Sequence, residues 1–121
     1  MFEPILWFQK PYKVGGTLAD NILENELGAW NEEALQKYSL YNGLSSANII
    51  KVMTGNEDSG KHITQKPLKL MELLVELVTI QGQIVLDSFA GSGTVCVAAK
   101  NLNRQYIGIE ADHAYVDITN Q

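Results

Sequence analysis

The residues best suited to chemistry form a short glycine-containing stretch and an acid that follows it. Asp87 ends an apolar run, and Gly91 and Gly93 come shortly after it. Glycine lets the backbone turn sharply and lets a ligand approach the main chain closely, while the first amides of a following helix lack partners within that helix. Glu110 follows at about the spacing, roughly 20 residues past the loop, at which a βαβ nucleotide fold places a carboxylate on ribose hydroxyls. The pattern therefore predicts a site for a nucleotide-like cofactor.

Three elements must position these groups. The β-branched apolar run 84–86 predicts a buried parallel strand, the segment 95–102 predicts a helix after the glycine loop, and 105–110 predicts a second strand that ends in the acid. Taken alone, the glycines could mark an ordinary strand-to-helix turn. Strand, loop, helix, strand and terminal acid together favour a ligand site in an α/β fold.

The glycine spacing disfavours a nicotinamide-dependent dehydrogenase. That version of the site uses GxGxxG, whose third glycine permits close packing of the helix against the strand. Here the residue three places after Gly93 is Cys96. Cys96 lies among small apolar residues and is predicted to be a core residue rather than a reactive thiol. Because it is the only cysteine, no disulfide can form within the chain.

Three segments resemble, in the same order, the amino-group DNA methyltransferases, which methylate adenine N6 or cytosine N4 with S-adenosylmethionine. The segments are HITQKPLKLMELLVELV from His62, IVLDSFAGSGT from Ile84 and RQYIGIEADHAY from Arg104. They are similar to the HPTQKP and DPFxGSGT segments of that family and to the strand that follows them. The resemblance implies a partial Rossmann-like S-adenosylmethionine-dependent methyltransferase fold, with parallel strands flanked by helices.

The resemblance also implies which residues bind the cofactor. In the family, the strand-end acid and the glycine loop hold the methionine end, the HPTQKP segment lies beside it, and the acid after the second strand binds the ribose. Carried over, the candidate cofactor-binding residues are Thr64, Gln65, Lys66, Asp87, Phe89, Ala90, Gly91, Ser92, Gly93, Thr94 and Glu110, with His62 and Pro67 completing the first segment. Ile63 and Ser88 stand where the family has prolines. Loss of those rigid residues is expected to weaken cofactor affinity.

Without the resemblance, one of these candidates has a different interpretation. Lys66 would be an exposed charge near a helix start, since Pro67 is tolerated in a first turn and an apolar stripe follows it. That stripe runs through Leu68, Met71, Val75 and Val78, and Leu70, Leu74 and Leu77 widen it. The helix is therefore expected to be buried on more than one side.

The chain lacks the residues that carry out methyl transfer in the family. Those enzymes use a [DNS]PP[YFW] tetrad, which holds the amino group by hydrogen bonds and stacks on the flipped base. The only prolines are Pro4, Pro11 and Pro67, so no tetrad is present. There is also no Ser/His/Asp or paired-carboxylate arrangement, and His62 has no second metal ligand at suitable spacing. We expect neither catalytic residues nor a metal site here.

The chain divides into two predicted segments. Residues 62–121 form the S-adenosylmethionine-binding α/β segment. Residues 1–61 form a strand plus an irregular segment that resembles the family's target-recognition region. The strand is expected at Ile5–Phe8, where the sequence resembles the EPILWFxK strand that follows the catalytic half in these enzymes, and it stops before Pro11. The front of an enzyme is therefore expected to be absent.

Within the first segment, 14–31 has the composition of an irregular surface segment. Asn31 is predicted to cap a short helix over 32–40, with Leu35 and either Tyr38 or Leu40 facing the core. A strand is expected at 47–53, followed by a polar loop.

Composition limits the partners. The formal net charge of −5 and the pI near 4.9 argue that this chain alone binds DNA only weakly, because phosphate contacts require clustered Lys or Arg. There is no apolar run near 18 residues and no signal-peptide pattern, so a membrane role is not expected and a cytoplasmic bacterial or phage setting fits. In the family's sheet, the strand that resembles Ile5–Phe8 and the strand that resembles 84–86 are not neighbours, and the strands between them come from the catalytic half. Their absence would leave an open edge and apolar faces here, so the expected partner is the missing catalytic half or a second copy.

The sequence thus favours a fragment of a site-specific DNA methyltransferase, of the kind found in restriction-modification systems, that supplies the cofactor-binding part. Adenine N6 is preferred over cytosine N4 only because it is the commoner outcome for the resemblance. The alternative is a non-catalytic binding module or degenerate prophage remnant that retains the fold.

Overall fold

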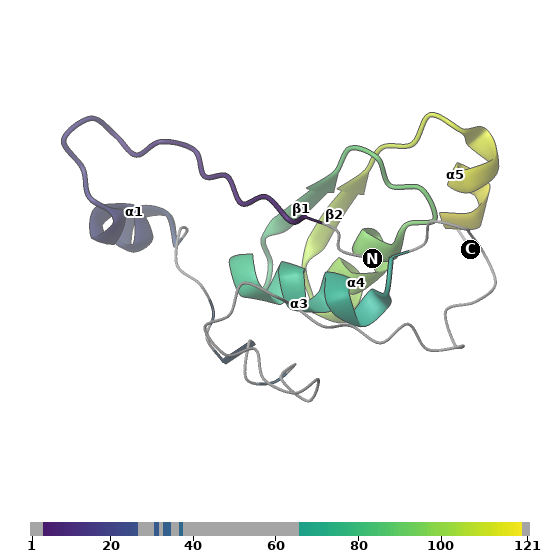
Figure 1. Ribbon diagram of the computed structural model, residues 1–121, viewed down its shortest axis with the longest axis horizontal. Helices are drawn as coiled ribbons and strands as arrows, with labels where there is room; N and C mark the ends of the chain where they lie inside the picture. The colour runs from purple at the N-terminus through teal and green to yellow at the C-terminus, as the bar shows by residue number, and fades with distance from the viewer. Residues whose placement is uncertain (1–3, 27–30, 32, 35–36, 38–65, 120–121) are drawn as a thin grey trace. The chain divides into compact units, whose positions relative to one another are not determined.

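The computed structural model describes residues 4–26, 31, 33–34, 37 and 66–119. The chain divides into two compact units, Met1–Trp30 and Asn31–Gln121, each described here by itself. The described elements, in chain order, are α1 (Leu18–Asn25), α3 (Leu68–Val78), β1 (Ile84–Asp87), α4 (Thr94–Asn101), β2 (Gln105–Gly108) and α5 (His113–Thr119) (Figure 1). Within the described ranges, no helix combines the length and the apolar character that crossing a membrane requires.

Strands β1 and β2 form a parallel pair. Ile84 lies opposite Gln105 and Asp87 lies opposite Gly108. Parallel neighbours need a crossover connection, which α4 supplies. The main-chain pairing continues past the strands, since the Ile109 amide donates to the Asp87 carbonyl at 2.8 Å. The predicted order of strand, loop, helix and strand is confirmed.

The core of the second unit, Asn31–Gln121, lies where α3 packs on α4. The buried apolar side chains described in this unit are Leu73, Val75 and Leu77 of α3, Cys96, Ala98 and Ala99 of α4, and Ala34. Small residues on α4 allow α3 to come close. The predicted stripe on α3 is only partly right, because Val78 at the end of the helix is exposed and Leu73, which the stripe left out, is buried.

Strand β1 is not the buried strand that its apolar run predicts. Ile84 and Leu86 are 59% and 60% exposed, and burial alternates along the strand. Successive side chains of a strand point to opposite faces. Gly108, opposite Asp87, lies on the face covered by Cys96 of α4. Ile84, Leu86 and the equally exposed Ile107 therefore form the other face of the sheet.

In the first unit, the strand predicted at Ile5–Phe8 is absent. Leu6 and Phe8 are 73% and 86% exposed, and residues 4–10 have no regular secondary structure. A strand is stable only when it pairs with another, and an apolar run does not by itself provide that pairing. The prediction of a strand here is wrong for this structure.

Helix α1 lies inside the segment that was expected to be irregular. The Thr17 hydroxyl accepts from the Asp20 amide at 3.2 Å, and the Asp20 carboxylate accepts from the Thr17 amide at 2.8 Å, which is a capping box. The hydrogen bonds from Thr17 lower the pKa of Asp20. The Thr-x-x-Asp spacing was the available sequence signal, but Gly15, Gly16 and the polar composition around them favoured a loop.

In the second unit, the predicted cap at Asn31 is confirmed. The Ala34 amide donates to the Asn31 side chain at 3.2 Å, and residues 33, 34 and 37 are helical. Lys37 forms an ion pair with Glu76 of α3 at 2.8 Å. Other predictions in this region fall outside the described residues, namely the core roles of Leu35, Tyr38 and Leu40, the strand at 47–53 and the loop after it.

Gly108 lets α4 lie close to β2. A Cβ atom at Gly108 would come within 2.9 Å of Cys96 Sγ and 3.3 Å of Ala90 Cβ. The third glycine of a nicotinamide site provides such room from the helix, whereas here the glycine is on the strand. Cys96 is buried, as predicted, and burial together with the nearby negative charge of Asp87 raises the pKa of its thiol.

Replacing Gly108 with alanine is expected to lower the free energy of unfolding by about 1–3 kcal/mol, because the added methyl overpacks the contact between helix and strand. Cys96→Ala removes the sulfur atom that makes the shortest contact with the added methyl group. The double variant should therefore be less destabilised than the sum of the two single variants. Urea denaturation followed by circular dichroism measures the three values. Strictly additive losses would show that the Gly108–Cys96 contact does not limit the packing.

Candidate functional site

The loop between β1 and α4 is a tight turn built on two glycines. Gly91 and Gly93 have φ values of 52° and 77°, in the left-handed region that favours glycine. The Gly93 amide donates to the Ala90 carbonyl at 2.8 Å, and the Phe89 amide donates to Asp87 Oδ1 at 3.1 Å. The Asp87 carboxylate, at the end of β1, therefore holds the first turn of the loop by accepting from a main-chain amide.

Glu110 joins this loop to the segment after β2. Its Oε2 accepts from the Gly91 amide at 2.7 Å, and its Oε1 accepts from the Asp112 amide at 2.9 Å. Both connections lie at the ends of the strands to which the arrows point in Figure 1. In open α/β sheets, ligands bind outside these carboxyl ends. The structure thus brings the predicted loop and the predicted acid into direct contact.

The remaining loop residues combine an exposed aromatic ring with a helix start. Phe89 is 91% exposed, whereas Thr94 is buried. The hydroxyls of Ser92 and Thr94 lie 3.3 Å apart. The N-cap residue of α4 is Gly93, which has no side chain to bond the first amides of this helix. These groups can receive a flat ring system and an anionic group.

The predicted site residues differ in how far the structure describes them. Those it brings to one edge of the sheet are Asp87, Phe89, Ala90, Gly91, Ser92, Gly93, Thr94 and Glu110. Lys66 is exposed just before Pro67, which takes the N-cap position of α3. Thr64 and Gln65 lie outside the described residues, as does His62. Cofactor binding by any of these residues stays a prediction.

Arg104 has a structural role that the sequence did not predict. This side chain is only 8% exposed. Its guanidinium donates to the carbonyls of Thr79 and Leu102, each at 2.6 Å, and to the Thr79 hydroxyl at 3.1 Å. Those residues are the C-caps of α3 and α4, where carbonyls lack helical partners and a cation is favoured by the helix dipole. The only sequence signal was an arginine set directly before an apolar strand.

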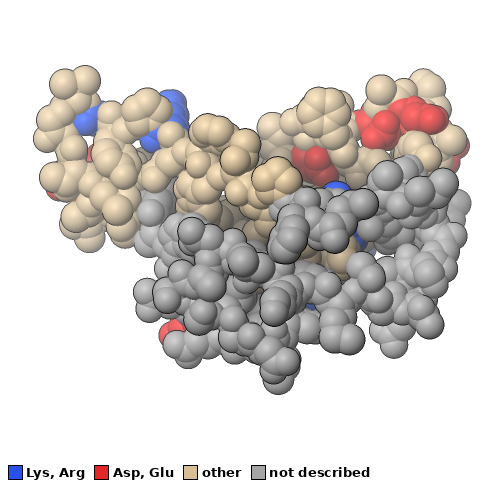
Figure 2. Space-filling model, viewed as in Figure 1, with Lys and Arg blue, Asp and Glu red and all other residues tan. Residues whose placement is uncertain are grey.

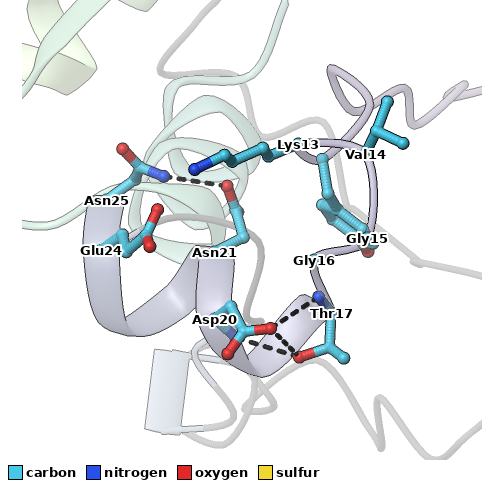
Figure 3. A pocket seen from close by; sticks show the side chains of 10 residues that line it. Lys13, Val14, Gly15, Gly16, Thr17, Asp20, Asn21, Glu24 and Asn25 are labelled. Atoms are coloured by element: carbon cyan, nitrogen blue, oxygen red, sulfur yellow. Dashed lines mark hydrogen bonds between the residues drawn. The ribbon is translucent and has the colours of Figure 1, made fainter.

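A separate hollow lies in the first unit. It is a pocket of about 330 Å³ beside α1 (Figure 3). Its lining residues are Tyr12, Lys13, Val14, Gly15, Gly16, Thr17, Asp20, Asn21, Glu24 and Asn25. Asp20 is already engaged in the capping box, and Asn25 donates to the Asn21 side chain at 3.1 Å. The polar groups that face this pocket are therefore partly occupied with one another.

Comparisons with known proteins identify the family of this chain. The family model N6_N4_Mtase, described as DNA methylase, matches residues 1–121. The Type II methyltransferase M.HindIII of Haemophilus influenzae is 56% identical over 119 residues, which cover 98% of this chain and 38% of that protein. The Type II methyltransferase M2.DpnII of Streptococcus pneumoniae is 35% identical over 116 residues, covering 96% of this chain and 40% of that protein.

Among solved structures, the crystal structure of an M1.HpyAVI–SAM complex is similar. It has a TM-score of 0.50 and 46% sequence identity, over 52% of this chain and 32% of that chain. The chain spans about two fifths of the length of M.HindIII and of M2.DpnII.

Proposed function

The chain belongs to the DNA methylase family, and we propose that it is the S-adenosylmethionine-binding part of a site-specific DNA methyltransferase acting on a base amino group. The hydrogen bond between Glu110 and the Gly91 amide carries the proposal, because it sets the loop and the acid at one edge of a parallel sheet. The names of the Type II relatives support the reaction, and the M1.HpyAVI–SAM complex supports the cofactor. Adenine N6 is preferred to cytosine N4 only as the commoner outcome for the resemblance.

The loop fits this cofactor. Among the residues that the structure describes, a Cβ atom at Gly91 would meet nothing nearer than the Phe89 carbonyl oxygen at 4.0 Å, which leaves room for a ligand beside the main chain. Asp87 would hold the amino group of the methionine end, the amides at the start of α4 its carboxylate, and Glu110 the ribose hydroxyls. Each carboxylate oxygen has two lone pairs, so Glu110 can accept from a ribose while keeping its main-chain bonds. When bound, the cofactor supplies an electrophilic methyl group.

Methyl transfer would need groups that this chain lacks. The sequence contains no tetrad to hold a flipped base. Figure 2 shows acidic side chains gathered where α5 lies, and the net charge of −5 does not favour binding to phosphates. We therefore propose that a catalytic half supplies the tetrad and most of the DNA contacts. We also propose a cytoplasmic location, because the DNA lies there. The missing tetrad equally suits the second candidate, a non-catalytic binding module or prophage remnant.

The open face of the sheet supports a partner. Ile84, Leu86, Ile107 and Ile109 are each 51–60% exposed. At about 25 cal/mol per Å², leaving about 400 Å² of apolar surface in water forfeits on the order of 10 kcal/mol, comparable to the whole stability of a small domain. We propose that the catalytic half covers this face, and that a second copy of the chain covers it when the catalytic half is absent.

The first prediction concerns the loop. Gly91→Leu should abolish binding of S-adenosylmethionine, because leucine is strained at a φ of 52° and its side chain fills the approach to the main chain. Gly82→Leu is the matched control, since Gly82 has a φ of 85° and open space around it but lies before β1. Isothermal calorimetry compares the variants. Equal binding by wild type and Gly91→Leu would show that the loop is not the site.

The second prediction concerns the open sheet face. The isolated chain should associate at micromolar concentration, and Leu86→Glu should shift it toward the monomer, because a charge on the face disfavours burial. Ile80→Glu is the control, since Ile80 is also exposed, at 46%, but lies outside the sheet. Light scattering coupled to gel filtration gives the mass. A monodisperse monomer of 13.4 kDa that melts cooperatively would contradict the proposal.

A further inference from the structure

We propose that Glu110 is a positioning residue for the glycine loop, distinct from any contact it makes with a ligand. Its carboxylate holds the Gly91 main chain in the left-handed turn before a cofactor arrives. The functional role of this hydrogen bond rests on the proposed function, since a pre-formed loop matters only if the loop binds the cofactor. The hydrogen bond itself is a property of the ligand-free chain.

The geometry points to a bridge rather than a single contact. Glu110 uses one oxygen for the Gly91 amide, at 2.7 Å, and the other for the Asp112 amide, at 2.9 Å. Asp112 in turn accepts from the Ala114 amide at 2.9 Å, at the start of α5. One side chain thus ties the loop after β1 to the turn that begins α5. Hydrogen bonds to a charged acceptor are shorter and stronger than neutral ones.

The loop needs such a tether because of its residue types. Glycine loses more backbone entropy on ordering than any other residue, and this loop holds two glycines in the left-handed region. If the loop is already ordered, ligand binding loses less conformational entropy, and the affinity is higher. A carboxylate with the reach of glutamate supplies two acceptors to two amides. A glutamine has one acceptor oxygen, and an aspartate is one methylene shorter.

Hydrogen exchange followed by NMR on the full ligand-free chain tests the proposal. In the wild type, the Gly91 amide should be protected. Glu110→Gln should speed its exchange by about tenfold, since a charged acceptor is replaced by a neutral one. Amides of Leu77 and Ala98 in the core should exchange as before. Asp112→Asn is the matched control, because it neutralises a neighbouring carboxylate of the same turn but leaves the Gly91 bond in place, so Gly91 should be unaffected.

Three results would overturn the inference. The Gly91 amide could exchange freely in the wild type. Glu110→Gln could speed exchange at Gly91, Leu77 and Ala98 equally, which would make Glu110 a residue of global stability. Glu110→Gln could also weaken S-adenosylmethionine binding while Gly91 exchange stays unchanged, which would leave Glu110 only a ligand contact. Selective loss of protection at Gly91 supports the inference even if the chain binds no S-adenosylmethionine, in which case the proposed function alone fails.

Discussion

Parallel pairing of β1 with β2 is the constraint on which the rest of this unit depends. Two parallel strands cannot be joined by a tight turn, so the chain must cross over, and the eight-residue helix α4 makes that crossing. The crossover puts the loop after Asp87 and the acid after Gly108 at the same end of the sheet. It also presses α4 onto β2, which is why a glycine faces Cys96. The contact between Glu110 and Gly91 is a consequence of this topology.

The opposite end of the same unit is held by a different kind of interaction. Arg104, immediately before β2, donates hydrogen bonds to the C-cap carbonyls of α3 and α4. It is buried, but its charge meets three acceptors, so it pays little of the penalty of an unpaired buried cation. Strand β2 therefore lies between Arg104, which bonds the C-caps of α3 and α4, and Glu110, which bonds the glycine loop. Each strand of the sheet is four residues long.

Features set by neighbouring residues were predictable from the sequence, and features set by distant contacts were not. The strand, glycine loop, helix and acid follow from local pattern, as does the cap at Asn31. Burial of β1 was mispredicted because it depends on what covers the far face of the sheet, which the sequence of the strand does not specify. A strand at Ile5–Phe8 needs a partner from elsewhere. The role of Arg104 depends on carbonyls brought together by the fold, and the capping box of α1 was outweighed by the glycines before it.

The candidate site was predictable to the same extent. The motifs identify the loop and Glu110, and the structure adds that the Glu110 carboxylate accepts a hydrogen bond from the Gly91 main-chain amide. Thr64 and Gln65 remain predictions from the resemblance. The chain matches the family over its whole length but spans only about two fifths of two of its curated relatives. A glycine loop without a catalytic tetrad and an exposed apolar sheet face are consistent with that share.

We propose that the cofactor binds at the edge formed by the loop and Glu110. The most direct test is the change in backbone amide NMR shifts of the full chain as S-adenosylmethionine is added. The largest changes are expected at Phe89, Gly91, Gly93 and Glu110, with the core amides of α3 nearly unchanged. Changes confined to the pocket beside α1, or none at millimolar cofactor, would contradict it.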